Sequence, residues 1–546
     1  MTRPQLLLLA IAGCARAAYM DKRATSTSTT SSSPTTVPDY FQTTPEIFAG
    51  PTPTGVAPFL AQSNPAPFGS PVFVANAPLE TAEPIVGNTN NASIFQLMAN
   101  LSPYFPNPVG FGVDEYPLPA GANISQVQML HRHGSRYPTS DSSVAKFGKR
   151  IAKAAGSLNA TGALSFLNDW KFQLGAEILV PVGRGELLNS GILHYYQYGH
   201  LYNTSSKIIA RTTTEDRMLH SAENFMAGFF GLGWTDNATL EVIIEADGFN
   251  NSLAGYDNCN NSNTYVSAGG SNATATWEAI YLANATARLG ALVSGYNWTL
   301  TDTYAAQTLC PYETVALGYS AFCDLFTYAE WEGFEYSNDL SFYGSDSFGS
   351  PTGRAIGIGY VQEVLARLQN VLPAPINATS NNATLDNSTA TFPLNQALYF
   401  DFSHDTNIMS ILTAFGLTQF AQYLPPTRIV PRNLTVSHLE PFGARLDIEI
   451  IHAPHAVFSN RTATSSPVYD LSSPPTTYVH FVMNQRTIPL GWSLPPCGLR
   501  TDGWCEINAF IASQADSVAL ANFDYACNGD YPSRPPGNIT NGAPLV

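Results

Sequence analysis

Charged side chains are scarce in this chain of 546 residues, where Asp, Glu, Lys and Arg together make up 12%, about half the usual share. The formal net charge is −16. Lysine occurs only at positions 22, 146, 149, 153, 171 and 207, so the rest of the chain cannot carry a lysine-rich surface. Because binding to a nucleic-acid backbone depends on Lys and Arg, the composition argues against a nucleic-acid partner.

Long apolar runs and paired cysteine motifs are also lacking. Beyond the N-terminus no stretch is apolar enough to span a membrane, and no hydrophobic tail of the kind that a lipid anchor requires ends the chain. No Cys-x-x-Cys pair occurs, which argues against a zinc or thiol-redox site. We therefore expect no metal, no cofactor and no membrane partner.

The first residues are typical of a secretory signal. Arg3 precedes an apolar stretch at residues 6–11, and Ala15-Arg16-Ala17 offers a small-residue cleavage site. A buried N-terminal strand is the alternative. Lys22-Arg23 resembles a dibasic processing site. We predict a signal peptide at 1–17 and a secreted, extracellular protein.

Sequons and cysteines agree with this compartment. Seventeen Asn-x-Ser/Thr sequons extend from Asn91 to Asn538, which predicts N-linked glycans. Removal of Cys14 with the signal leaves six cysteines, an even number that suits disulfide bonds in an oxidising environment. The sequence alone leaves their pairing open.

Composition divides the remainder into further parts. Ser, Thr and Pro dominate the start, and such a segment cannot bury enough apolar surface to fold. Sequons and helical spacing dominate the middle of the chain. We predict a disordered leader at 18–60, an irregular arm at 61–115, an α/β core at 116–236 and 386–530, an inserted and mostly helical domain at 237–385, and a C-terminal tail at 531–546.

The local patterns predict alternating strands and helices. The strands are expected at residues 124–130, 208–211 and 398–402, and the helices at 143–155, 216–230, 276–293, 359–372 and 407–415. In open α/β sheets, ligands bind beyond the carboxyl ends of the strands. Two of these ends deliver histidines, at residues 131–139 and at 403–405.

The segment at 131–139, His-Arg-His-Gly-Ser-Arg-Tyr-Pro-Thr, combines groups that phosphoryl transfer needs. A neutral imidazole at His133 can attack phosphorus, and the forked guanidiniums of Arg132 and Arg136 can grip phosphate oxygens. Gly134 would let the backbone approach the anion closely. The alternative is that His133 is only a hydrogen-bonded histidine at a strand end.

Several segments together resemble the histidine acid phosphatases, and most of all their fungal branch, which includes the phytases. They are Ser-Pro-Tyr-Phe at 102–105, Arg-His-Gly-x-Arg-x-Pro-Thr at 132–139, Glu-Asp-Arg at 215–217, Gly-Ile-Gly at 357–359 leading into Ala-Arg-Leu at 366–368, Asp-Phe-Ser-His-Asp at 401–405 and Pro-Phe-Gly-Ala-Arg at 441–445. The resemblance implies an α/β fold, like that of the phosphoglycerate mutases, in which a mixed central sheet is flanked by helices and carries an inserted, mostly helical smaller domain.

The resemblance also implies roles for individual residues. His133 would be the nucleophile that forms a phosphohistidine, and Asp405 would donate a proton to the leaving alcohol. Burial and a nearby phosphate would help to keep Asp405 protonated, although an N-cap role for the following helix is an alternative. The phosphate-binding residues would be Arg132, Arg136, Arg217 and His404.

One of these roles has an alternative, the remaining histidines need an interpretation, and the resemblance also implies a pairing of the cysteines. Arg217 could instead pair with Glu215 or Asp216 at a helix start, as arginines there often do. We interpret His131 as a core or supporting histidine, and His194, His200 and His220 as structural ones. Similarity to fungal phytases implies disulfides between Cys259 and Cys527, Cys310 and Cys323, and Cys497 and Cys505.

The expected substrate is a small phosphomonoester, but the sequence defines the identity of this substrate less closely than it defines the reaction. Fungal phytases typically carry Gly-Gln-Tyr where this chain has Ala-Asn-Leu at 99–101, and a lysine where it has Ser142. We therefore expect a secreted acid phosphatase of broad specificity that can accept phytate. A dedicated phytase is the first alternative, and a phosphoglycerate-mutase-like transferase or an inactive binding glycoprotein are others. The sequence indicates no oligomeric state.

Overall fold

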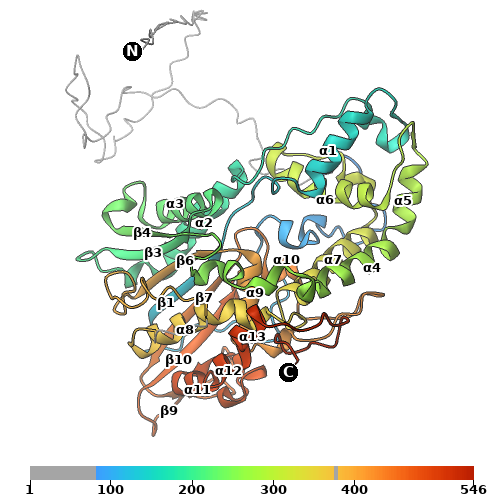
Figure 1. The fold of residues 1–546 in the computed structure, drawn as a ribbon. Coiled ribbons are helices and arrows are strands. Elements are labelled where there is room, and N and C mark those ends of the chain that lie inside the picture. The colour runs from blue at the N-terminus through green and yellow to red at the C-terminus, as the bar shows by residue number, and fades with distance from the viewer. Residues whose placement is uncertain (1–80, 374–378, 546) are drawn as a thin grey trace, which may run out of the picture. The chain divides into compact units, whose positions relative to one another are not determined.

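The computed structural model describes residues 81–373 and 379–545 (Figure 1). The predicted signal peptide, the Lys22-Arg23 pair, the leader and the start of the arm at 61–115 lie outside these residues. Among the helices that are described, none is long and apolar enough to cross a membrane.

Within the described residues, one mixed sheet has the strand order β11-β10-β7-β1-β6-β3-β4, with β12 paired to β10. Its strands are β1 Asn123–Arg132, β3 Ile208–Thr213, β4 Ala238–Ile243, β6 Leu398–Ser403, β7 Arg445–Ala453, β10 Thr476–Met483, β11 Arg486–Ile488 and β12 Cys505–Glu506. β1, β6, β3 and β4 run parallel, whereas β7 pairs antiparallel with β1 and with β10. The three predicted strands correspond to β1, β3 and β6, and the antiparallel half was not predicted.

Helices cover both faces of this sheet (Figure 1). On one face, α2 Pro181–Tyr198 and α3 Asp216–Phe230 pack on Val127 and Met129 of β1. On the other, α8 Gly353–Gln369, α9 Asp405–Ala414 and α11 Ile507–Ser513 pack on Leu130 and on the antiparallel strands. Successive β1 residues thus serve opposite layers, as the period of a strand requires. The predicted mixed α/β fold class is confirmed.

A second group of helices lies beside the sheet (Figure 1). It contains α1 Ser143–Ala154, α4 Gly269–Tyr281, α5 Ala283–Gly290, α6 Leu300–Leu317 and α7 Tyr328–Ser345. Thr299 and Thr327 begin α6 and α7 with capping boxes, which satisfy the free amide groups of the first turn. Phe147 of α1 packs in one apolar cluster with Trp331 of α7, although α1 lies within the predicted core segment.

The division into core and inserted domain stays a prediction, and the predicted start of the inserted domain has to be placed later in the chain. β4 at Ala238–Ile243 pairs with β3 in the main sheet, so an inserted segment cannot begin at 237. The described residues, 81–373 and 379–545, belong to one unit by their contacts. We place the start of the insertion after Ile243.

The predicted helices recur with adjusted ends. Those at 143–155 and 216–230 are α1 and α3, and those at 359–372 and 407–415 are α8 and α9. The helix expected at 276–293 is instead two, because the chain breaks at the fully buried Leu282 between α4 and α5. Short elements complete the fold: α10 Val436–Leu439, α12 Ser517–Ala521, α13 Phe523–Asn528, and the strand pairs β2 Asn159–Ala160 with β5 Val293–Ser294 and β8 Ala456–Val457 with β9 Tyr469–Asp470.

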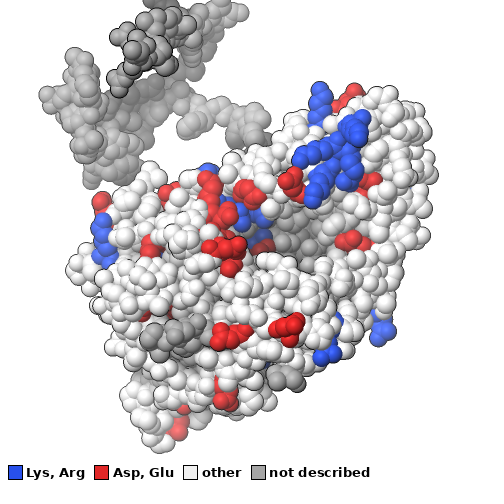
Figure 2. Space-filling model, in the orientation of Figure 1, with Lys and Arg blue, Asp and Glu red and all other residues white. Residues whose placement is uncertain are grey.

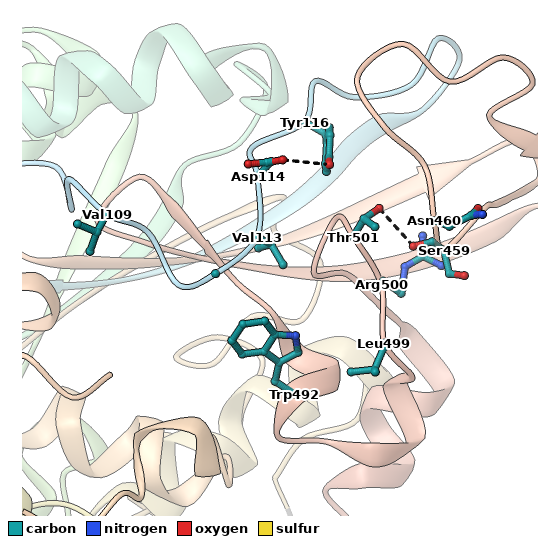
Figure 3. A pocket seen from close by; sticks show the side chains of 11 residues that line it. Val109, Val113, Asp114, Tyr116, Ser459, Asn460, Trp492, Leu499, Arg500 and Thr501 are labelled. Carbon is teal, nitrogen blue, oxygen red and sulfur yellow. Dashed lines mark hydrogen bonds between the residues drawn. The ribbon is translucent and has the colours of Figure 1, made fainter. Parts of the chain in front are cut away.

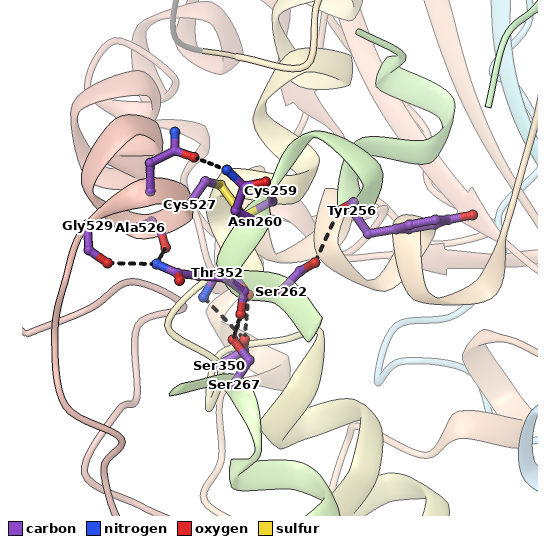
Figure 4. Close-up of a disulfide and its surroundings, with 12 residues drawn as sticks. Tyr256, Cys259, Asn260, Ser262, Ser267, Ser350, Thr352, Ala526, Cys527 and Gly529 are labelled. Atoms are coloured by element: carbon purple, nitrogen blue, oxygen red, sulfur yellow. Dashed lines mark hydrogen bonds between the residues drawn. A yellow bond between two sulfur atoms is a disulfide. The ribbon is translucent and has the colours of Figure 1, made fainter. Parts of the chain in front are cut away.

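Three disulfides have the pairing that the resemblance implied: Cys259 with Cys527, Cys310 with Cys323, and Cys497 with Cys505. Figure 4 shows the first, which joins residues 268 positions apart. Beside it, the Asn261 amide donates to the carbonyl oxygens of Ala526 at 3.1 Å and Gly529 at 2.9 Å. The disulfide between Cys259 and Cys527 fastens the segment after β4 to the end of α13.

Candidate active site

Two neighbouring parallel strands bring the histidine segments together. β1 and β6 pair with Arg132 opposite Ser403, so the residues after each strand leave the sheet at the same edge. His133 and His404 lie there, almost fully buried, with their ring centroids 5.8 Å apart. The structure thus places both predicted segments at the carboxyl edge of the parallel strands.

The ring of His133 has a fixed orientation. Its Nδ1 lies 2.9 Å from the carbonyl oxygen of Gly134, which can only accept a hydrogen bond. Nδ1 therefore carries the ring proton and Nε2 keeps a free lone pair. Burial lowers the pKa of His133 well below its ordinary value of 6.5, and neighbouring guanidiniums, first that of Arg132, lower it further. The imidazole is consequently neutral in mildly acidic solution.

Gly134 packs the loop after His133 against α2. A Cβ atom at this position would lie 2.3 Å from the carbonyl oxygen of Gly183 and 2.6 Å from Leu187. The sequence interpretation assigned this glycine to the approach of an anion, whereas the structure gives close contact with α2 as the reason for it.

Arg132 is fully buried and held on three sides. Its Nη1 donates to the carbonyl oxygens of Asn100 and Glu440, each at 2.6 Å, and its Nη2 lies 2.7 Å from Oδ2 of Asp405. The guanidinium stands 4.6 Å from the ring centroid of Phe442. These contacts fix the position of the head group.

The three arginines that the resemblance assigned to phosphate share a feature that Arg367 and Arg445 also have. The Nε atoms of Arg132, Arg136 and Arg217 are buried, and none has a hydrogen-bond partner within the described residues. The charges of all three guanidiniums also lower the pKa of His133, so all three lie close to it. Because three of these donors lie close to one imidazole and each can donate to an anion, the arrangement suits anion binding beside His133.

Arg217 nevertheless has carboxylate neighbours. Its Nη1 donates to Glu215 at 2.7 Å and to Glu177 at 3.2 Å. The pairing with Glu215 that the sequence left open is therefore present, together with a second carboxylate. Arg211, the nearest arginine before it, instead forms a buried ion pair with Asp401.

Asp405 is the first residue of α9, and the N-cap position belongs to His404. Its Oδ2 accepts a hydrogen bond from the Asn100 amide at 2.9 Å and faces Arg132. Burial raises the pKa of Asp405, but Arg132 and the Asn100 amide outweigh burial and leave it below the ordinary value. The expected effect of burial is present but does not dominate, so this carboxyl is ionised at about pH 5.

His404 is held by a carboxylate that the sequence did not indicate. Its Nε2 lies 3.0 Å from Glu245, the second residue after β4, and the Tyr256 hydroxyl donates to the other Glu245 oxygen at 2.6 Å. Burial raises the pKa of Glu245, but His404 and these hydrogen bonds lower it to about 2. The pair fixes the His404 ring beside His133.

Glu186 of α2 is a further residue that the sequence analysis missed. It accepts hydrogen bonds from the Ser135 amide at 2.7 Å, the Ser135 hydroxyl at 2.9 Å and the Tyr104 amide at 3.0 Å. It thereby fixes the loop after His133. Glu186 lies far from the loop in sequence and its helix has no matching motif, so no local signal could have identified it.

Three of the histidines for which we predicted a structural or supporting role contact other side chains. His131 is buried, with its Nε2 2.8 Å from the Ser190 hydroxyl, and its ring stacks on Phe402. His194 is buried against Asp447 at 3.0 Å, and His220 lies 2.8 Å from a glutamate one turn along α3.

Cavities elsewhere on the surface lack these residues. One of about 670 Å³ lies between Tyr116, Trp492 and Arg500 (Figure 3), and one of about 870 Å³ lies between α1 and Trp170. The candidate site is therefore identified by its buried histidines and arginines rather than by the volume of a cavity.

Comparisons with known proteins bear on this site and fold. The family model "Histidine phosphatase superfamily (branch 2)" matches residues 123–484. Phytase A of Aspergillus fumigatus is 32% identical over 434 residues, which cover 76% of this chain and 87% of that protein. Phytase A of Emericella nidulans is 33% identical over 433 residues, which cover 76% and 88%.

The solved structure of the phytase from D. castellii has the same fold, with a TM-score of 0.62 at 24% identity, and the match covers 81% of this chain and 89% of that one. Fold and comparisons together define a phosphatase. The chain belongs to branch 2 of the histidine phosphatase superfamily. The resemblance drawn from the sequence motifs is confirmed.

Proposed function

We propose that this protein is a secreted acid phosphatase that hydrolyses phosphate monoesters through a phosphohistidine intermediate. One observation carries the proposal: the buried imidazole of His133, whose pKa is lowered, lies close to Arg132, Arg136 and Arg217, and the Nε donors of these arginines have no partner in the part of the chain that the structure describes. These arginines, with His404 as a further donor, bind the phosphate oxygens. The reaction needs no cofactor.

In the first step, Nε2 of His133 attacks phosphorus and the bond between phosphorus and the ester oxygen breaks. Asp405 gives its proton to the leaving alkoxide, so an alcohol departs and a phosphohistidine remains. In the second step, water attacks phosphorus, Asp405 takes a proton from that water, and the bond between phosphorus and nitrogen breaks. Inorganic phosphate and neutral His133 result.

Asp405 must gain a proton before it can donate one. Its low pKa depends on Arg132, 2.7 Å away. A phosphate dianion bound to Arg132 offsets this cation and adds a negative charge nearby, so substrate binding raises the pKa of Asp405. This predicts that the productive complex takes up a proton, which acidic solution favours.

For the substrate, we favour broad specificity for monoesters, with phytate among them. Asn100 and Ser142 differ from the residues that fungal phytases usually carry at these positions. The alternative of a dedicated phytase has the names of the relatives in its favour. A comparison of kcat/KM for phytate with that for simple monoesters distinguishes the two.

The mechanism is tested with p-nitrophenyl phosphate at about pH 5. The wild type should hydrolyse it, His133→Ala should not, and His220→Ala on the nearby α3 surface is the matched control. Turnover of labelled substrate, quenched in alkali, should leave an alkali-stable and acid-labile phosphoprotein. Hydrolysis that persists in His133→Ala contradicts the nucleophile, and a wild type without activity favours a binding glycoprotein.

Secretion and N-glycosylation form part of the same proposal. Three disulfides in the described residues suit an oxidising compartment, and the signal-like start suits export. Sequencing the N-terminus of the exported protein would test cleavage after Ala17.

A further inference from the structure

Arg217 differs from the other two arginines of the candidate site because two carboxylates already hold it. Glu215 and Glu177 both accept hydrogen bonds from its Nη1, and their side chains are 39% and 32% exposed. Both carboxylates therefore reach solvent beside Arg217, and we take this edge as the mouth of the site.

The position of Glu177 is built into the fold. Its φ is +68°, a left-handed conformation that is costly for a residue other than glycine. Its backbone amide donates to Pro138 at 3.0 Å, and its carboxylate accepts from the Ser140 amide at 2.6 Å. The loop after the nucleophile segment thus holds Glu177 against Arg217.

Glu215 is also committed to this contact. It occupies the N-cap position of α3, yet its side chain caps none of the helix amides. The carboxylate points to Arg217 instead, at 2.7 Å. The usual reason for an acidic residue at a helix start therefore does not explain its orientation.

Further carboxylates lie on the other side of the site. Glu245 contacts His404, and Asp247 and Asp257 follow it in the same segment. After burial, the charges of Glu245 and Asp247 raise the pKa of Asp257 to about 6, which shows that these groups lie close together. Figure 2 shows acidic side chains beside basic ones at a hollow of the surface between the sheet helices and the helices around α1.

These charges act differently on substrates with one phosphate and with many. The reacting phosphate lies among the arginines, whereas additional phosphates extend to the mouth and meet carboxylates. A carboxylate about 7 Å from a phosphate dianion weakens binding about sevenfold even in the dielectric of water.

We propose that Glu215 and Glu177 are specificity-determining residues, which make the site prefer esters that carry a single phosphate over polyphosphorylated ones. The inference rests on the proposed function, because it assumes that Arg217 binds substrate phosphate. It names the substrate class that the proposed phosphatase takes.

The test measures binding without turnover, by calorimetry with inorganic phosphate and with myo-inositol hexasulfate. Glu215→Gln should bind hexasulfate about five- to tenfold more tightly and phosphate about two- to threefold more tightly, and Glu215→Lys should extend the trend. Glu223→Gln removes an equal charge from α3 without touching Arg217 and should change neither affinity by more than about twofold.

The outcomes are distinct. If Glu215→Gln and Glu215→Lys leave the ratio of the two affinities as it is in Glu223→Gln, the inference is overturned. A wild type that binds both anions but hydrolyses no monoester contradicts the proposed function. In that case the ratio of the two affinities in the Glu215 variants still decides whether Glu215 selects against polyphosphorylated anions. A melting temperature equal to that of the wild type verifies that each variant is folded.

Discussion

Asp401 belongs to a group of four buried charges behind the candidate site, and its replacement by asparagine gives a quantitative test of the structure. The carboxylate accepts hydrogen bonds from Arg211 at 2.7 and 3.1 Å, from Arg367 at 2.7 Å and from the Tyr360 hydroxyl at 3.1 Å. Glu363 pairs with the far side of Arg211, so two cations and two anions balance. Asp401→Asn preserves the shape and leaves one positive charge uncompensated.

The expected loss of stability follows from the burial of the group. Removing one partner of a buried ion pair costs about 3–5 kcal/mol. In a protein of this size each kcal/mol lowers the melting temperature by about 1–2 °C, so Asp401→Asn should melt about 3–10 °C below the wild type near neutral pH.

The difference should also depend on pH. Burial raises the pKa of Asp401, but Arg211 and Arg367 outweigh burial and hold it far below its ordinary value. A group whose pKa is lowered by folding stabilises the protein above its unfolded pKa of about 3.9, and this contribution is lost as the pH falls below it. The difference in melting temperature between Asp401→Asn and the wild type should therefore be smaller at pH 2.5 than at pH 5.5.

Differential scanning calorimetry at these two pH values measures both effects, with the exposed Asp530→Asn as the matched control. Melting of Asp401→Asn within about 1 °C of the wild type at pH 5.5 would refute the electrostatic reasoning. A difference in melting temperature that is larger at pH 2.5 than at pH 5.5 would refute the predicted direction of the pH dependence.

Three further predictions concern the site. Asp405→Asn should slow alkyl phosphates about 10²–10⁴-fold and p-nitrophenyl phosphate much less, because a poor leaving group needs the proton; equal slowing of both esters in steady-state assays would count against the role. Burial and the arginines lower the pKa of His133, so any decline of kcat/KM for p-nitrophenyl phosphate on acidification should begin well below pH 6.5; a fall that follows a pKa near 6.5 would contradict this. Asn100 forms a sequon with Ser102 but donates its amide to Asp405, so glycopeptide mass spectrometry should find it unmodified even where Asn460, exposed on a turn, carries a glycan.

The sequence predicted the elements that carry a continuous local pattern. The helix at 216–230 was found with its ends, because its apolar spacing begins directly after an acidic cap position. Both histidine segments were placed on one sheet edge because parallel strands deliver their carboxyl ends together. The split at Leu282 was missed, since the apolar spacing continues through it.

The features that could not be predicted from the sequence depend on contacts between distant segments. Glu186, Glu245 and Asn100 reach the site from α2, from the end of β4 and from the arm, and no spacing relates them to His133. Likewise, sequons at 237 and beyond gave the segment the composition of a loop region and obscured β4, which is a partly exposed edge strand. The direction of the pKa of Asp405 required the position of Arg132, which only the fold defines.

The bond between Cys259 and Cys527 has a consequence for how the protein responds to proteases. Because it spans 268 positions, a single peptide-bond cleavage anywhere inside that interval leaves two fragments that remain covalently joined. Such nicked molecules would migrate as one band without reductant and as two bands with it. A cut between Cys259 and His404 places His133 and His404 on opposite fragments, so the crosslink lets a nicked molecule keep both halves of the candidate site on one covalent particle.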